Sequence, residues 1–229
     1  MDNHQIPPGT EPLLDGAEIP ENQKAQEEKP HPFAVEEHLL QRGDYYDIRQ
    51  KIPQLTQITI GAGWDHKAFE EDPLDVDLSC FLLNKADQTR EDQDFVFYNN
   101  DRACEGAVRH NGDSRNGAGD GDDESISIDL NGLPFDIVKI VFTLTIYNAE
   151  EREHTMGKVR SMYFRLVNDE DQNEIFRFPL SEEEYAGTIG IKVGELVREG
   201  PKWYFSALGE PIPGGLGKRA TQYGLIITL

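Results

Sequence analysis

Alternating hydrophobic and polar residues run through most of the chain from Leu55 onward and predict β-strands. In the stretch S-I-S-I-D-L, Ile126, Ile128 and Leu130 alternate with polar residues, as in a strand with one buried face. The stretch K-I-V-F-T-L-T-I-Y is β-branched and aromatic almost throughout, which is typical of a strand buried on both faces. The segments expected to form strands are 56–60, 78–83, 95–98, 125–130, 139–147, 162–167, 175–178, 188–196, 202–208 and 223–228.

Turn residues separate these segments, among them Asn131-Gly132, Gly200-Pro201 and Pro213-Gly214-Gly215. Many short strands with turns between them, and scarcely a long helix, predict an all-β fold built as an antiparallel β-sandwich. The loops of a sandwich gather at the ends of its sheets, so side chains that are distant in sequence can meet there.

The first fifty residues have a different pattern. Residues 1–32 are polar, acidic and rich in proline, and we expect a disordered tail, which serves as a tether or as a docking strip for a partner. Within 33–52, Val35 and Leu39 recur at helical spacing and predict a short helix that packs on the domain or on a partner. The sandwich domain itself is expected over 53–229.

The charge narrows the range of functions. The chain has 229 residues and a formal net charge of −21, which argues against binding to nucleic acid or directly to anionic lipid. A hydrophobic content of 37% is sufficient for a real core. No stretch approaches the roughly 18 apolar residues of a membrane span, and the start lacks the pattern of a secretory signal. We therefore expect a soluble, cytoplasmic protein.

An acidic, glycine-rich run from Gly112 to Glu124 is the strongest chemical signal in the sequence. Its carboxylates are Asp113, Asp120, Asp122, Asp123 and Glu124, and its only basic residue is Arg115. Carboxylates packed on one loop repel one another, so the loop either stays solvated or binds hard cations. Ca²⁺, which takes roughly six to eight oxygen ligands, suits such a loop better than Mg²⁺.

Two further polar groups flank predicted strands. Asp75 and Asp77 precede one strand, and because alternate residues of an extended segment point the same way, their carboxylates face one side. An alternative role for these two acids is protection of a sheet edge. Asn99 and Asn100 follow the next strand, where an asparagine either caps a turn or supplies an amide oxygen.

Taken together, these stretches resemble the TerD family, bacterial tellurite-resistance and stress-response proteins. The resemblance covers roughly 53–229. The matching motifs are G-A-G-W-D (61–65), D-V-D-L-S-C-F-L-L (75–83), D-F-V-F-Y-N-N (94–100), the acidic run (112–124), K-I-V-F-T-L-T-I-Y-N-A (139–149), F-R-L-V-N-D (164–169), G-E-L-V-R (194–198), K-W-Y-F-S-A-L-G (202–209) and G-G-L (214–216).

The resemblance implies a β-sandwich that binds about two Ca²⁺ ions at neighbouring sites, without catalytic activity, in resistance to tellurite and related stresses. The metal ligands that it implies are Asp75, Asp77, Asn99, Asn100, Asp113, Asp120, Asp122, Asp123 and Glu124. Asp65 is a further candidate that competes with a role in a turn. The implied partners are other proteins of a stress-response complex, with the N-terminal extension as a contact; the oligomeric state is left open.

The sequence departs from the family pattern in three places. An N-terminal extension of about fifty residues has no counterpart in the short start of the family. Asn148 stands where a carboxylate is common, and Lys218-Arg219 lie in a reduced version of the final motif. These differences indicate a divergent member with a different partner.

Two other classes of function remain alternatives. A hydrolase with paired carboxylates would use His110 or His154 as a proton carrier, but the common catalytic motifs are absent and solvated histidines are expected. A calcium-dependent membrane or scaffold module would insert Trp64 into the lipid surface, for which core packing is the alternative.

Cys104 lies in a polar loop, where neighbouring Glu105 should raise the pKa of its thiol and lower its reactivity. Cys80 and Trp203 are expected in the core.

Overall fold

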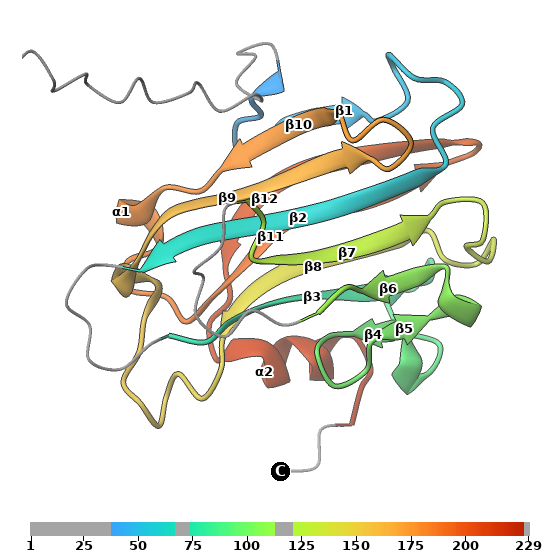
Figure 1. The fold of residues 1–229 in the computed structure, drawn as a ribbon. Helices are drawn as coiled ribbons and strands as arrows, with labels where there is room; N and C mark the ends of the chain where they lie inside the picture. Colours follow the sequence, from blue (N-terminus) through green and yellow to red (C-terminus); the bar gives the residue numbers. More distant parts are fainter. Residues whose placement is uncertain (1–37, 67–73, 113–120, 227–229) are drawn as a thin grey trace, which may run out of the picture. The chain divides into compact units, whose positions relative to one another are not determined.

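The computed structural model describes residues 38–66, 74–112 and 121–226. All of them belong to one compact unit, Val35–Leu229. The strands form two six-stranded sheets in which neighbouring strands are antiparallel, as Figure 1 shows. The predicted all-β antiparallel sandwich is therefore confirmed.

The first sheet has the order β1-β12-β11-β8-β3-β4 and the second the order β10-β9-β2-β7-β6-β5. The strands of the first sheet are β1 (Tyr45–Asp47), β12 (Lys202–Pro211), β11 (Gly190–Glu199), β8 (Lys139–Ile146), β3 (Val76–Leu83) and β4 (Phe95–Val96). Those of the second are β10 (Glu174–Pro179), β9 (Val159–Asn168), β2 (Gln57–His66), β7 (Glu124–Asp129), β6 (Val108–His110) and β5 (Arg102–Ala103). Short helices connect or follow strands: η2 (Asp92–Asp94), η3 (Cys104–Gly106), η4 (Met156–Lys158), α1 (Glu182–Tyr185) and α2 (Gly215–Gln222).

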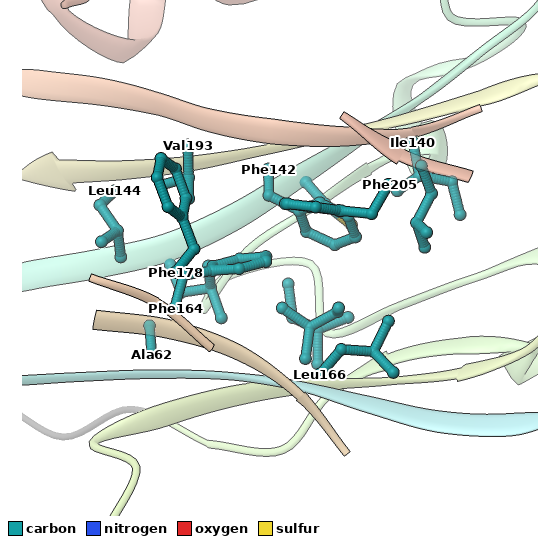
Figure 2. Close-up of a cluster of buried hydrophobic side chains, with 14 of the residues drawn as sticks. Ala62, Ile140, Phe142, Leu144, Phe164, Leu166, Phe178, Val193 and Phe205 are labelled. Atoms are coloured by element: carbon teal, nitrogen blue, oxygen red, sulfur yellow. The ribbon is translucent and has the colours of Figure 1, made fainter. Parts of the chain in front are cut away.

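Aromatic side chains from both sheets fill the space between them (Figure 2). Phe164 of β9 lies with its ring centroid 5.4 Å from that of Phe142 in β8 and 5.4 Å from that of Phe205 in β12. Phe176 of β10 lies 4.6 Å from Phe205. These contacts hold the two sheets face to face through apolar burial, the main favourable term in folding.

A second, smaller apolar cluster lies on the outer face of the first sheet, beneath α2. Ala220 and Tyr223 pack there against Phe81 and Leu83, and the Tyr223 and Phe81 ring centroids are 5.0 Å apart. The strand expected over 223–228 is wrong in its described part, because α2 ends at Gln222 and a turn follows it. The ring of Tyr223, at the C-terminal end of α2, covers this apolar face of the first sheet.

The N-terminal part of the described chain is extended. Leu39 forms a parallel bridge with Arg177 of β10, and β1 pairs with β12 at the edge of the first sheet. From Leu39 to Gly43 the described chain contains no helix, so this part of the expected short helix is wrong. The rest of that prediction, and the expected tail over 1–32, lie outside the described residues. The domain boundary near residue 53 stays a prediction.

Candidate functional site

The predicted ligands fall on three segments near one end of the sandwich. Asp113 and Asp120 lie outside the described residues. We call the other seven the acidic end: Asp75 and Asp77 at the start of β3, Asn99 and Asn100 after β4, and Asp122, Asp123 and Glu124 at the start of β7. Ala62 pairs with Glu124, so the last residues of β2 lie beside the start of β7.

Glu124 lies between the sheets and joins one to the other. Its side chain is buried, and Oε2 accepts a hydrogen bond of 2.7 Å from the backbone N–H of Leu78 in β3. Leu78 pairs with Leu144 of β8 on one side, and β4 pairs with β3 only at Cys80 and Phe81. The Glu124 side chain from the second sheet therefore contacts Leu78 where β4 does not reach.

His110 completes the same contact from β6. Its Nε2 lies 3.1 Å from the Leu78 carbonyl and 3.3 Å from Glu124 Oε2, while Nδ1 accepts the backbone N–H of Gly112 at 3.3 Å. Because Nδ1 is an acceptor, the ring proton is assigned to Nε2, which donates to both oxygens. The expectation of solvated histidines is wrong, since His110 and His154 are both buried.

Asp123 fastens the start of β7 to the end of β2. Its Oδ2 accepts the backbone N–H of Trp64 at 2.8 Å, and its own N–H donates to the Ala62 carbonyl at 2.8 Å. Trp64 is buried in the main core, as the packing alternative predicted. Insertion of this side chain into a lipid surface is therefore contradicted.

Asp122 lies on the outer face of the second sheet, where Arg165 holds it. Arg165 Nε is 2.7 Å from Oδ1 and Nη2 is 3.0 Å from Oδ2, which makes a bidentate pair. The Tyr163 hydroxyl donates to Oδ1 at 3.0 Å. Burial first, and then the Asp122 carboxylate, raises the pKa of the Tyr163 hydroxyl, which therefore keeps its proton.

Asp77 lies on the opposite face of β3 from the Glu124 contact. Val76 and Leu78 belong to the core between the sheets, so alternation places Asp77 on the outer face of the first sheet, paired with Thr145. The Asp77 side chain is nevertheless buried. Asp75 lies just before the strand, and its carbonyl accepts the backbone N–H of Tyr147 at 2.8 Å.

Asn99 and Asn100 form the turn that follows β4. Phe97 and Asn100 exchange two backbone hydrogen bonds, and Asn100 Nδ2 donates to the Phe95 carbonyl at 2.6 Å. Asn99 is exposed at the tip of the turn. Asn100 therefore has the turn-capping role that the sequence left open, while the amide oxygen of Asn99 is the one presented to solvent.

The donor chemistry of the acidic end fits a hard cation, because every predicted ligand offers oxygen. The contacts named above engage both oxygens of Asp122 but one oxygen each of Asp123 and Glu124. Within 38–66, 74–112 and 121–226, no group of three or more His, Cys, Asp or Glu is placed so as to hold a metal ion.

The opposite end of the sandwich contains a different cluster. Arg90 makes a bidentate pair with buried Asp94, at 2.8 and 2.7 Å, and its Nη2 lies 3.3 Å from Cys104 Sγ. Burial raises the pKa of the Cys104 thiol, and Arg90 opposes that shift. Arg90 and Cys104 border a surface cavity of about 500 Å³ that Arg102 and Pro134 also line. Cys80 and Trp203 are buried in the core, as predicted.

Comparison with known proteins adds independent information. A family model described as "TerD domain" matches residues 37–223. Tellurium resistance protein TerD of Serratia marcescens is 39% identical over 186 residues, which cover 81% of this chain and 96% of that protein. General stress protein 16U of Bacillus subtilis (strain 168) is 38% identical over 187 residues, with 81% and 96% covered.

A solved structure supports the fold. The crystal structure of a homologue of telluride resistance protein (TerD) from Streptomyces coelicolor A3(2) superposes with a TM-score of 0.59, over 72% of this chain and 95% of that one. At 18% identity this likeness concerns the fold alone. Among the described helices, none is long and apolar enough to cross a membrane.

Proposed function

Because the chain belongs to the TerD family, we propose that it is a non-catalytic stress-response protein of the tellurium-resistance type that binds calcium at its acidic end. About two ions would be held by oxygens of the acidic end together with Asp113 and Asp120. The bound ions would order a surface that partner proteins recognise. The names of the relatives, tellurium resistance and general stress proteins, support the setting.

The contact between Glu124 and Leu78 is the observation that carries this proposal. It brings the end of the acidic run, at the start of β7 in the second sheet, against the start of β3, which bears Asp77. Asp77 and Glu124 are only 5% and 2% exposed, and a buried carboxylate is costly unless its charge is compensated. On a chain of net charge −21, bound divalent cations would reduce the cost of burying carboxylates at this end.

The physical consequence is a calcium-dependent gain in stability. A ligand that binds only the folded state stabilises it by RT ln(1 + [L]/Kd), about 2.7 kcal/mol at a roughly hundredfold excess over Kd. For a domain of this size, that corresponds to a rise in Tm of about 5–11 °C.

Thermal melts of the full chain in EDTA and in excess Ca²⁺ test the proposal. We expect the rise in Tm with calcium to be lost in Asp77→Asn plus Asp123→Asn. Asp87→Asn is the matched control, because Asp87 pairs with Lys139 at the opposite end and should keep the full rise. Melts of the wild-type chain that coincide with and without calcium would refute the function.

A further inference from the structure

We infer that Asp122, although part of the acidic run, does not bind the cation but fixes the run in place, and that Arg165 and Tyr163 are its positioning residues. This inference rests on the proposed calcium function. It assigns a role to two residues on β9 that lie outside every predicted ligand motif.

The first argument is that Asp122 has no oxygen left to offer. Arg165 engages both oxygens and Tyr163 engages Oδ1 a second time. An ion that bound Asp122 would have to displace a bidentate guanidinium pair, which is among the strong charge-assisted contacts in proteins.

The second argument is that the sheet leaves room for this carboxylate. Gly61 of β2 lies beneath it, and a Cβ on Gly61 would come within 2.0 Å of Asp122 Oδ2. The carboxylate therefore packs directly on the backbone of β2, in a space that a glycine provides. Such a close fit is typical of a structural contact with one defined geometry.

The third argument concerns the neighbours of Asp122. Three successive acids take three different directions: Asp122 to Arg165, Asp123 to the Trp64 amide, and Glu124 to the Leu78 amide. Holding Asp122 on the outer face sets the chain where β7 begins and directs the next two side chains toward the acidic end. The Arg165 charge also reduces the repulsion between Asp122 and Asp123.

Arg165 is itself held firmly. It donates to Glu174 of β10 at 3.3 Å, and Glu174 accepts two bonds from Arg177 at 2.9 and 2.7 Å. The Arg177 guanidinium lies 4.1 Å from the centroid of the Tyr163 ring. This network is built on two paired strands rather than on a loop, which is the arrangement that positions a binding site most accurately.

Calcium titration of the full chain by calorimetry tests the inference with Asp122→Asn, Arg165→Gln and the double variant. Outer-shell partners typically change metal affinity by about 10–100-fold, so we expect each single variant to weaken Ca²⁺ binding to that extent with the stoichiometry unchanged. The double variant should bind within about threefold of the weaker single variant, because the two residues act as one unit. Arg109→Gln, an exposed arginine on β6, is the control and should bind as wild type.

Amide hydrogen exchange in EDTA provides a reading that needs no calcium. We expect the Trp64 and Leu78 amides, which donate to Asp123 and Glu124, to exchange roughly tenfold faster in both single variants. Unchanged protection in both would overturn the inference, as would loss of one bound ion in Asp122→Asn with wild-type affinity in Arg165→Gln. A wild-type chain that binds no calcium would instead refute the proposed function, and the exchange rates would still decide the positioning role.

Discussion

The two ends of the sandwich hold their carboxylates in different ways. At the opposite end, Asp94 is paired with the Arg90 guanidinium four residues away, and Asp87 with the Lys139 ammonium. At the acidic end, Asp123 and Glu124 accept backbone amides of strands far away in the sequence. Asp122 pairs there with the Arg165 guanidinium.

This difference is the reason for expecting calcium to stabilise the acidic end. A cationic side chain cancels the charge of the carboxylate that it pairs with. At the opposite end, the charges of Asp94 and Asp87 are therefore neutralised by side chains of the protein itself. A backbone N–H contributes a partial charge, which lowers the cost of burying a carboxylate without cancelling it. We therefore expect a divalent cation to stabilise the acidic end more than the opposite end.

The largest expected effect is that of removing Arg90. Arg90→Ala leaves the fully buried Asp94 carboxylate without its guanidinium, and breaking a buried pair from one side costs about 3 kcal/mol. Urea denaturation measures the loss, and the same loss is expected with and without calcium. Lys85→Ala, an exposed lysine on the same loop, is the control. A loss below about 1 kcal/mol would show that Asp94 does not depend on this partner.

A smaller effect is expected at Gly61. Gly61→Ala forces the Asp122 carboxylate to move, since the added Cβ would overlap Oδ2, and such overpacking costs about 1–3 kcal/mol. The same variant should weaken calcium binding in the way that Arg165→Gln does. Chemical denaturation and calorimetry together check both effects. Gly187→Ala serves for comparison because nothing lies within 4 Å of its added carbon; equal losses at both glycines would contradict the account.

The smallest effect concerns the thiol at the opposite end. Because burial raises the pKa of the Cys104 thiol, this group's contribution to the free energy of unfolding is present below the unfolded thiol pKa of about 8.5. It is lost as the pH rises toward the folded pKa.

Alkylation by iodoacetamide should modify one cysteine per native chain, faster as the pH rises. Arg90→Ala should slow it further, because Arg90 lowers that pKa. Modification of buried Cys80 at the same rate would contradict this.

The long strands could be predicted because they are long enough to show a pattern. β8 and β7 display continuous and alternating burial, as their sequences indicated. β5 and β6 have two and three residues, too few for any period, and they form through their neighbours. The helix α2 had a signal that was missed: Leu216, Ala220 and Tyr223 recur at helical spacing, but glycines at its start and β-branched residues after it suggested a strand.

The acidic end was predictable in its residue types and only in part in its geometry. Asp75, Asp77 and the acidic run stood out by their closely spaced carboxylates, and the resemblance to the TerD family implied their role as ligands. The pair between Asp122 and Arg165 spans 43 residues and depends on the register of β2 against both β7 and β9, which no local pattern specifies. The burial of His110 depends likewise on the contact between sheets at Leu78.

A calorimetric titration of the full wild-type chain with Ca²⁺, repeated with Mg²⁺, tests the central claim most directly. We predict saturable binding of about two calcium ions per chain, with magnesium bound more weakly because it demands near-octahedral geometry. A titration with calcium that shows no binding heat at several temperatures, accompanied by an unchanged melting temperature, would contradict the claim that the acidic end is a cation site.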